Sequence, residues 1–252
     1  MESLAIAPAA TGVRYRTRIA RGIAPLADLY LPTDPNGASV VLVHGGGFVV
    51  GSRAMKPMRL LAARLSSARI SVCAIDYRMI FRGGRLTEAL DDVLAAHAFW
   101  GERVAGYGLD PARVSMIGLS AGGTLAILAA ARAAAGTVHR LVSCFGLYEL
   151  DQLQGPASML PRLLFGTSDR YDWRMRSPHH AEPPRVPTLL LHGDDDRLVP
   201  VEQARRLAAR REELGLPTKL VVYPGAPHGF FNVTAGAAAS AATSELIAHV
   251  TG

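Results

Sequence analysis

The chain is 252 residues long, 49% hydrophobic and 19% charged, which is typical of a globular protein with a sizeable core. Its formal charge is +6, but the arginines are spread along the chain without a basic block or interleaved aromatics, which argues against nucleic-acid binding. No apolar run approaches the roughly 20 residues that cross a bilayer, and the N-terminal stretch lacks the basic region and long apolar core of a secretory signal. We therefore expect a cytoplasmic protein with neither a membrane nor a nucleic acid as partner.

Short apolar runs alternate with longer amphipathic stretches along most of the chain. Strands are predicted at residues 40–43, 70–75, 114–117, 141–145, 188–191 and 219–223, and helices at 55–67, 87–104, 121–134, 201–214 and 240–250. Because most of these strands are apolar throughout, they are expected to be covered on both faces. The alternation predicts an α/β fold with a mainly parallel central sheet flanked by helices. An upstream pair, 13–19 and 26–31, is expected to add an antiparallel edge.

Residues 149–187 break this alternation with prolines, scattered aromatics and several arginines. The segment is too long for an ordinary connection between a strand and a helix. We interpret about 150–186 as a short lid insertion within a single domain that spans 1–252. Two cysteines, Cys73 and Cys144, stand inside apolar runs without metal-ligand spacing, so we expect small buried hydrophobic residues and no structural zinc.

A candidate nucleophile follows one of the predicted strands. The strand runs into Gly118-Leu119-Ser120-Ala121-Gly122, and an alanine-rich helix follows at once. This is the G-x-S-x-G pattern in the strand–turn–helix context that exposes a serine oxygen near a helix N-terminus. A serine that merely caps the helix is the alternative. The small residues on both sides favour the nucleophile.

Acidic residues follow another predicted strand, in the stretch "LLLHGDDDRLVP". A solvated loop is the ordinary interpretation of three adjacent aspartates. However, a serine–histidine pair needs a carboxylate that fixes the imidazole tautomer and stabilises its cation. We choose Asp196 for this role, with Asp194 as the alternative.

His228 follows the last predicted strand, in "YPGAPHGFF", and is the candidate general base because imidazole titrates near neutral pH. The order serine, aspartate, histidine along the chain is that of α/β hydrolases. The remaining histidines are interpreted as structural: His44, His97, His139, His179, His180, His192 and His249.

The first predicted strand of the parallel set ends in "HGGG", residues 44–47. Bare glycine backbone can approach a developing oxyanion closely, and fixed N–H donors there contribute roughly 3–4 kcal/mol each. A phosphate loop is the competing interpretation, since Gly46 and Gly51 have the spacing of its glycines. Ser52 and Arg53 stand where that motif needs lysine and a hydroxyl residue, so nucleotide binding is disfavoured. The dinucleotide fingerprint also fails, because Val50 occupies its last glycine position.

Together, "HGGGFVVGS", "GLSAGG", "HGDDDRLVP" and "PHGF" resemble the hormone-sensitive-lipase-like branch of the α/β hydrolases, which includes small bacterial carboxylesterases. The resemblance runs from about residue 27 to about residue 231. It implies an α/β-hydrolase fold and a carboxylesterase in which Ser120 attacks the acyl carbon, His228 is the base and Asp196 orients it. The position of Asp196 relative to Val199-Pro200 favours it over its neighbours. An acyl-enzyme would then be hydrolysed by water.

The resemblance also assigns the oxyanion donors to the N–H groups of Gly46, Gly47 and Ala121. It implies a small-molecule ester as substrate, with no metal and no organic cofactor. Family members are often homodimers, but no interface can be read from this sequence.

Three departures from the family pattern bear on the substrate. Leu119 stands where the family often has an acidic residue, residues 79–85 replace a common Leu-Ala-Pro-Glu continuation, and only about 40 residues precede the glycine loop. The short N-terminal segment predicts a reduced cap and an open, shallow pocket for short acyl chains. Phe48 and parts of 159–173 are predicted to line it.

Two other functions remain open on the residues alone. The same motifs fit an aryl formamidase or another amide hydrolase, because they do not reveal the leaving group. A catalytically inactive hydrolase fold that serves as a binding module is the third hypothesis.

Overall fold

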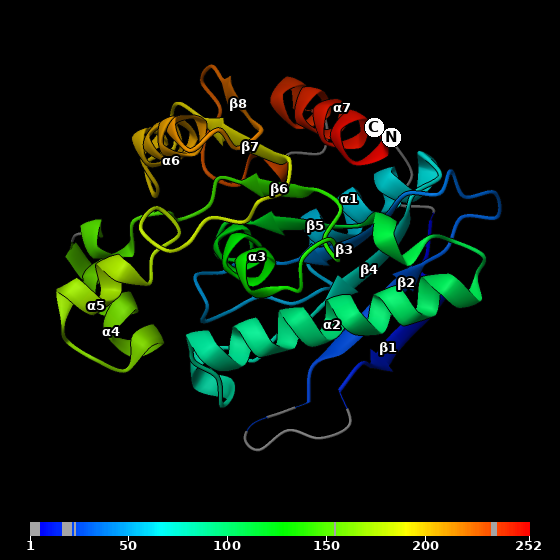
Figure 1. Ribbon diagram of the computed structural model, residues 1–252, viewed down its shortest axis with the longest axis horizontal. Helices are drawn as coiled ribbons and strands as arrows, with labels where there is room; N and C mark the ends of the chain where they lie inside the picture. Colours follow the sequence, from blue (N-terminus) through cyan, green and yellow to red (C-terminus); the bar gives the residue numbers. More distant parts are fainter. Residues whose placement is uncertain (1–5, 17–21, 23, 154, 233–235) are drawn as a thin grey trace.

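The computed structural model describes the chain except residues 1–5, 17–21, 23, 154 and 233–235. One eight-stranded sheet has the strand order β1-β2-β4-β3-β5-β6-β7-β8 (Figure 1). Its strands are β1 (Ala10–Arg14), β2 (Leu26–Tyr30), β3 (Ser39–Val43), β4 (Ser71–Ile75), β5 (Val114–Leu119), β6 (Leu141–Cys144), β7 (Thr188–Gly193) and β8 (Thr218–Tyr223). Strands β3 to β8 pair in parallel, while β2 pairs antiparallel with both β1 and β4.

Helices cover both faces of the sheet (Figure 1). Those outside residues 150–186 are α1 (Lys56–Ser67), α2 (Leu86–Gly106), α3 (Ala121–Arg132), α6 (Val201–Glu213) and α7 (Ala237–Thr251). One hydrophobic cluster joins α2, α3 and α6 to one face, and a second cluster joins α1 and α7 to the other. All five residues of β3 and of β4 are buried, as expected for strands covered on both faces.

The predicted mainly parallel sheet with flanking helices is confirmed, and each predicted parallel strand and helix lies within a few residues of its observed bounds. The antiparallel edge is also confirmed, although the upstream strand occupies Ala10–Arg14 rather than 13–19. Part of that predicted strand, residues 17–19, lies outside the described residues.

Between β6 and β7 the chain leaves the sheet and forms two short helices, α4 (Met159–Phe165) and α5 (Arg170–Met175). They lie together at one end of the molecule, at the lower left of Figure 1. Ser177 ties this segment to its own start, since its hydroxyl accepts a hydrogen bond from the Leu150 N–H and donates one to the Trp173 carbonyl. The buried indole of Trp173 in turn donates to the Thr167 carbonyl. These contacts give residues 150–177 an internal framework of their own.

The loop that departs from the family pattern is ordered by a 3-10 turn, Ile80–Arg82, before α2 begins. The backbone N–H of Ile80 donates to the Phe48 carbonyl, which links this loop to the segment after the glycines. Just upstream, the buried Arg78 guanidinium pairs with Asp92 of α2. The different sequence therefore still forms a defined connection from β4 to α2.

Candidate active site

The predicted catalytic residues meet at the carboxyl edge of the parallel strands. Ser120 follows β5, Asp196 follows β7, and His228 follows β8. Because β3, β5, β6, β7 and β8 lie side by side and in parallel, their carboxyl ends open at one edge of the sheet. Ligands of open α/β sheets bind at this edge.

Ser120 occupies a strained turn between β5 and α3, with φ 52° and ψ −119°. A side chain at either flanking glycine would collide with backbone: a Cβ on Gly118 would lie 2.1 Å from the Gly122 carbonyl oxygen, and one on Gly122 would lie 2.3 Å from that of Val43. The turn is anchored where the Ser120 N–H donates to the Cys144 carbonyl of β6. The sequence pattern therefore reflects crowding that presents the hydroxyl at the start of α3.

His228 bridges the serine and the aspartate. Its Nε2 lies 2.9 Å from Ser120 Oγ, and its Nδ1 lies 2.7 Å from Asp196 Oδ2. Because the carboxylate accepts, Nδ1 carries the hydrogen and leaves Nε2 free to accept the serine proton. The ring of Phe145 packs edge-on against the imidazole, with centroids 5.1 Å apart.

The Asp196 carboxylate is buried and accepts hydrogen bonds at both oxygens. Its Oδ1 accepts from the N–H groups of Leu198 at 3.0 Å and Val199 at 2.8 Å. Its Oδ2 faces the imidazoles of His228 at 2.7 Å and His192 at 3.1 Å. Burial alone would raise the pKa of Asp196, but the donors on His192, His228 and Val199 outweigh it and hold that pKa well below its usual range. The group is therefore an anion at neutral pH.

Asp194, the alternative acid, is turned to a different partner. Its carboxylate is exposed and accepts a hydrogen bond from the Gly225 N–H at 2.6 Å, which closes the loop after β8. Asp195 is also exposed and pairs with Arg197. Among the three adjacent aspartates, the geometry singles out Asp196.

The glycine loop after β3 lies beside Ser120 and carries unused donors. Gly46 has φ 115°, and a Cβ there would lie 1.9 Å from the Val50 carbonyl oxygen, so only glycine fits. The N–H groups of Gly46, Gly47 and Ala121 donate to no other group in the described part of the chain. Free N–H groups at this place fit the oxyanion donors that the sequence predicts.

His44, the first residue of this loop, is fully buried and contacts the backbone of the glycine that follows it. Its Nδ1–H donates to the Gly45 carbonyl at 2.6 Å, and its ring stacks on Tyr77 with centroids 4.4 Å apart. Burial lowers the pKa of His44, which keeps the imidazole neutral. The Tyr77 hydroxyl donates to the His44 carbonyl at 3.3 Å, so the two residues brace the end of β3 together.

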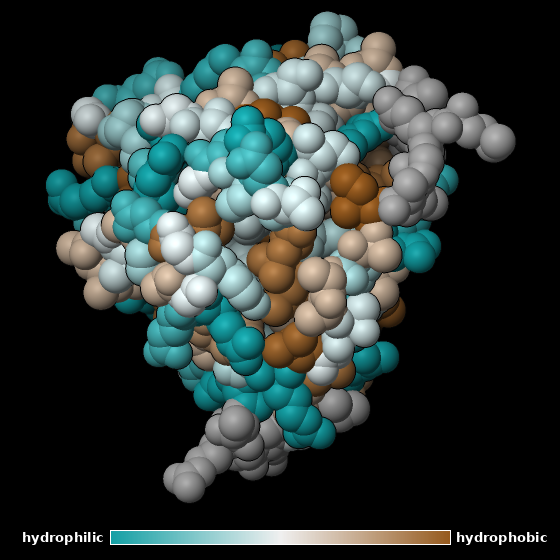
Figure 2. Space-filling model, turned by 90° about the vertical axis from the view of Figure 1, so that its right-hand side faces the viewer, coloured by the Kyte–Doolittle hydropathy of each residue, from teal (hydrophilic) through white to brown (hydrophobic). Residues whose placement is uncertain are grey.

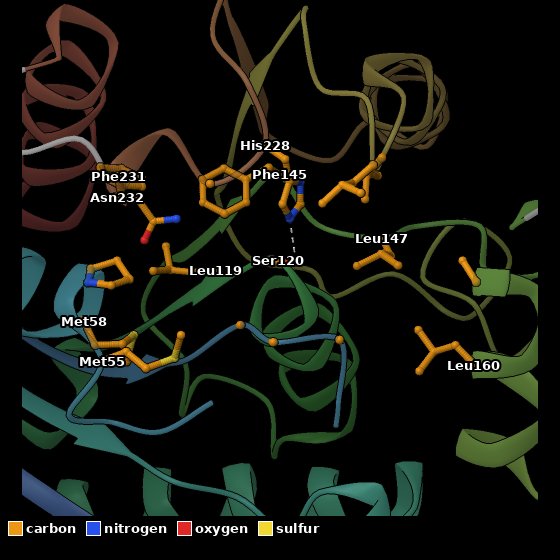
Figure 3. A pocket seen from close by; sticks show the side chains of 18 of the residues that line it. Met55, Met58, Leu119, Ser120, Phe145, Leu147, Leu160, His228, Phe231 and Asn232 are labelled. Carbon is orange, nitrogen blue, oxygen red and sulfur yellow. Dashed lines mark hydrogen bonds between the residues drawn. The ribbon is translucent and has the colours of Figure 1, made fainter. Parts of the chain in front are cut away.

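A cavity of about 380 Å³ opens over Ser120 and His228. In Figure 3, Met55, Met58, Leu119, Phe231 and Asn232 lie on one side of Ser120, and Leu147 and Leu160 lie on the other. Except for Asn232, these labelled flanks are hydrophobic. The cavity is lined by Gly45, Gly46, Gly47, Met55, Pro57, Met58, Leu119, Ser120, Phe145, Leu147, Leu153, Ala157, Leu160, Leu198, Val199, His228, Gly229, Phe231 and Asn232.

The prediction that Phe48 binds substrate is wrong. Its side chain is 1% exposed and packs in the hydrophobic core, and it is absent from the cavity lining. The backbone turns at φ 62° there, which directs the ring inward, away from the site. Within the predicted stretch 159–173, Leu160 reaches the cavity, whereas Trp173 is buried in the core.

Most of the hydrophobic lining was not identified from the sequence. Met55 directly precedes α1 and Met58 lies in its first turn, while Phe231 follows the histidine loop. Leu119 lines the cavity at the position where an acidic residue is common in the family. In the sequence, only the position of these residues near a motif indicates that they could line the cavity.

One cluster of candidate metal ligands lies outside this site. Ligand atoms of Glu149, His179 and His180 lie within 4.8 Å of one another. However, Arg206 pairs with the Glu149 carboxylate, and Arg174 donates to His180 Nε2 at 3.2 Å. The guanidinium groups occupy two of the three ligands, Glu149 and His180, and oppose a cation, so the cluster carries no metal assignment.

None of the described helices is both long enough and hydrophobic enough to cross a membrane. Figure 2 shows a face covered largely by hydrophilic and intermediate residues, with hydrophobic residues gathered in a broken central band.

Comparison with solved structures identifies the class of protein. A Thermogutta terrifontis esterase with propionate bound aligns with a TM-score of 0.74 and 26% identity, covering 97% of this chain and 93% of that one. A truncated carbohydrate esterase from gut microbiota has the same fold, with a TM-score of 0.80, 20% identity and coverage of 98% and 99%. The chain therefore belongs to the class of proteins with the α/β-hydrolase fold, as its motifs predicted.

Within this class the chain belongs to the BD-FAE family, whose pattern it matches over residues 27–210. It is 30% identical to a probable isoprenylcysteine alpha-carbonyl methylesterase of Oryza sativa over 80% of this chain and 54% of that protein. It is also 30% identical to esterase LipC of Mycobacterium tuberculosis over 86% of this chain and 60% of that protein. The chain thus spans little more than half the length of these curated relatives.

Proposed function

We propose that this chain is a serine carboxylesterase that hydrolyses small, short-chain carboxylic esters through an acyl-enzyme intermediate. The observation that carries the proposal is the continuous contact from Ser120 Oγ through His228 to the buried Asp196 carboxylate. This arrangement can activate a hydroxyl as a nucleophile, because the imidazole accepts its proton and the carboxylate stabilises the resulting cation.

In the first half of the proposed reaction, Ser120 Oγ attacks the acyl carbon while His228 Nε2 takes its proton. The N–H groups of Gly46, Gly47 and Ala121 donate to the oxygen that becomes negative. The C–O bond to the alcohol then breaks, and His228 returns the proton to the leaving alcohol. In the second half, water repeats the attack on the acyl-serine with His228 as base, and release of the acid restores Ser120.

The cavity supports a small substrate. Its volume of about 380 Å³ lies near the lower end of the roughly 300–1,000 Å³ of small-molecule pockets. Hydrophobic side chains on both sides of Ser120 fit an acyl group on one side and a short alcohol group on the other. The propionate bound to the similar Thermogutta terrifontis esterase supports a short acyl chain here. We further propose that residues 150–186 are a lid insertion, which contributes Leu153, Ala157 and Leu160 to this wall.

Turnover of p-nitrophenyl esters from acetate to laurate tests the proposal. The wild-type protein should cleave the short esters fastest, and Ser120→Ala should lower kcat/KM by at least about 10⁴-fold. Activity that persists in Ser120→Ala would refute the nucleophile assignment. Preference for laurate would refute the short-chain pocket while leaving the triad intact.

Two further substrates in the same panel separate the alternatives. An aryl formamide tests the amide-hydrolase hypothesis, which the triad geometry alone permits. A methyl ester of an isoprenylated cysteine tests the substrate named for the Oryza sativa relative, since the hydrophobic flanks of Ser120 are compatible with such a group. Turnover of either at more than the rate of the p-nitrophenyl acetate would replace the short-chain ester as the proposed substrate.

A further inference from the structure

His192 is a fully buried histidine that the proposed reaction does not use. It is the penultimate residue of β7, and its side chain is completely buried next to the acid loop. Its Nε2 lies 2.9 Å from the Val199 carbonyl oxygen and 3.1 Å from Asp196 Oδ2. Both atoms are hydrogen-bond acceptors, so Nε2 must carry a hydrogen.

The other ring nitrogen defines the charge of this imidazole. Nδ1 of His192 is buried and faces no hydrogen-bond partner among the described residues. A buried N–H without a partner is costly, so Nδ1 carries no hydrogen and the ring is neutral. His192 is thus held in a single tautomer that donates from Nε2 alone.

The same carboxylate oxygen therefore faces two imidazoles: His228 donates to it directly, and the Nε2–H of His192, which donates to the Val199 carbonyl, lies 3.1 Å from it. His228 Nδ1 approaches Asp196 Oδ2 from the side of the serine, and His192 Nε2 approaches it from the strand. The other oxygen is held by the N–H groups of Leu198 and Val199. Without His192, Oδ2 would keep only the donor on His228, which itself must move protons during the reaction.

We infer that His192 is a positioning residue for the proposed reaction: it fixes the Asp196 carboxylate, and the Val199 backbone that binds it, in the orientation that His228 requires. The rigid strand β7 supplies the fixed end of this contact, whereas His228 and Asp196 both stand on loops. This inference depends on the proposed triad, because a positioning residue has an effect only if the residue that it positions acts in the reaction.

A pair of substitutions separates the donor from the bulk of the ring. Glutamine places an N–H donor at the same distance along the side chain as Nε2, and methionine has similar length without a donor. His192→Met should lower kcat by about 10–50-fold with KM changed less than about twofold, because small misplacement of a catalytic group has an effect of this size. His192→Gln should lose no more than about threefold. His249→Met, at a partly buried histidine of α7, is the control and should keep the parent kcat.

A double-mutant cycle then tests whether His192 acts through Asp196. Asp196→Asn should lower kcat/KM by about 10³–10⁴-fold. His192→Met added to Asp196→Asn should cost less than about threefold more, since coupled residues are not additive. Melting temperatures of all variants identify any loss that comes from unfolding.

The outcomes are distinct. An equal loss of kcat in His192→Met and His192→Gln, or the full His192→Met loss in the Asp196→Asn background, would overturn the positioning role. Unchanged kcat in His192→Met would overturn it as well. If Ser120→Ala retains activity, the proposed function itself fails, whatever the His192 variants do.

Discussion

The proposed catalytic centre and the cavity wall contributed by the proposed insertion are built from different kinds of structure. At the proposed centre, the geometry depends on backbone conformation: Ser120 has φ 52°, Gly46 has φ 115°, and N–H groups there donate to no other described residue. In the wall, Leu153, Ala157 and Leu160 contribute only side chains. These three residues stand on short helices and turns, and none of them needs a positive φ or a free backbone N–H.

The difference indicates which part can change without loss of the reaction. A Cβ on Gly118 or Gly122 would lie within 2.4 Å of a backbone oxygen, so substitution there must displace the main chain. An exchange of Leu160 would change only the shape of an open cavity. We therefore expect large effects on rate at the centre and graded effects on substrate preference at the wall.

Of the effects that test this comparison, the largest is expected in the glycine loop. Gly46→Ala should lower kcat by at least about 100-fold, because its methyl group would meet the Val50 carbonyl oxygen and displace an oxyanion donor. Gly47→Ala is the matched variant, since a Cβ there meets no atom within 4 Å and only its φ of 61° is unfavourable. It should lose about tenfold or less. Steady-state kinetics and thermal melting of both proteins would test this, and equal losses would mean that crowding at residue 46 is not decisive.

A smaller effect is expected in the pH dependence of stability. The pKa of Asp196 is depressed in the folded protein by donors that outweigh the effect of burial, so the group stabilises the fold above the unfolded-state pKa of about 4. That contribution is lost as pH falls below about 4 towards the folded-state pKa. Asp196→Asn should therefore lower the free energy of unfolding at pH 7 by on the order of 2 kcal/mol, and the difference from wild type should shrink as the solution is acidified.

Urea unfolding at several pH values between 7 and 3 measures this difference. Asp195→Asn is the control, because its carboxylate is exposed and it should change stability little at any of these values. A wild-type advantage over Asp196→Asn that stays constant down to pH 3 would contradict the inferred stabilisation of the carboxylate.

The smallest effect is expected in the wall. Leu160→Trp should reduce kcat/KM for butyrate and longer p-nitrophenyl esters by roughly 5–20-fold while changing acetate by less than about threefold, because the larger ring narrows the cavity. Met159→Trp is the matched control: residue 159 is 59% exposed and does not line the cavity. If kcat/KM for the acetate ester falls as much as for the longer esters, Leu160 affects the reacting residues themselves. The two regions would then not differ in the way proposed.

Much of the fold and the proposed site could be predicted from local sequence. Continuous apolar runs identified the parallel strands, since burial on both faces leaves no alternation. The glycines around Ser120 and at Gly46 are required by close backbone contacts within a few residues or with an adjacent strand. Such constraints leave a readable pattern of small residues, and the strand order brings the motifs to one edge.

Contacts between distant segments decided the remainder. The choice of Asp196 over Asp194 depends on which carboxylate faces the loop after β8, and three adjacent aspartates look alike in sequence. Phe48 stands beside the glycine loop, yet its backbone turns the ring into the core.

The sequence by itself determined the strand-and-helix alternation, the tight turn at Ser120 and the glycine loop, because short-range sterics and burial restrict the residues allowed there. Only the tertiary structure decided which hydrophobic side chains form the cavity and that His192 shares the Asp196 oxygen with His228. These features depend on packing between segments far apart in the chain, and no single segment carries a pattern for a partner that it meets only after folding.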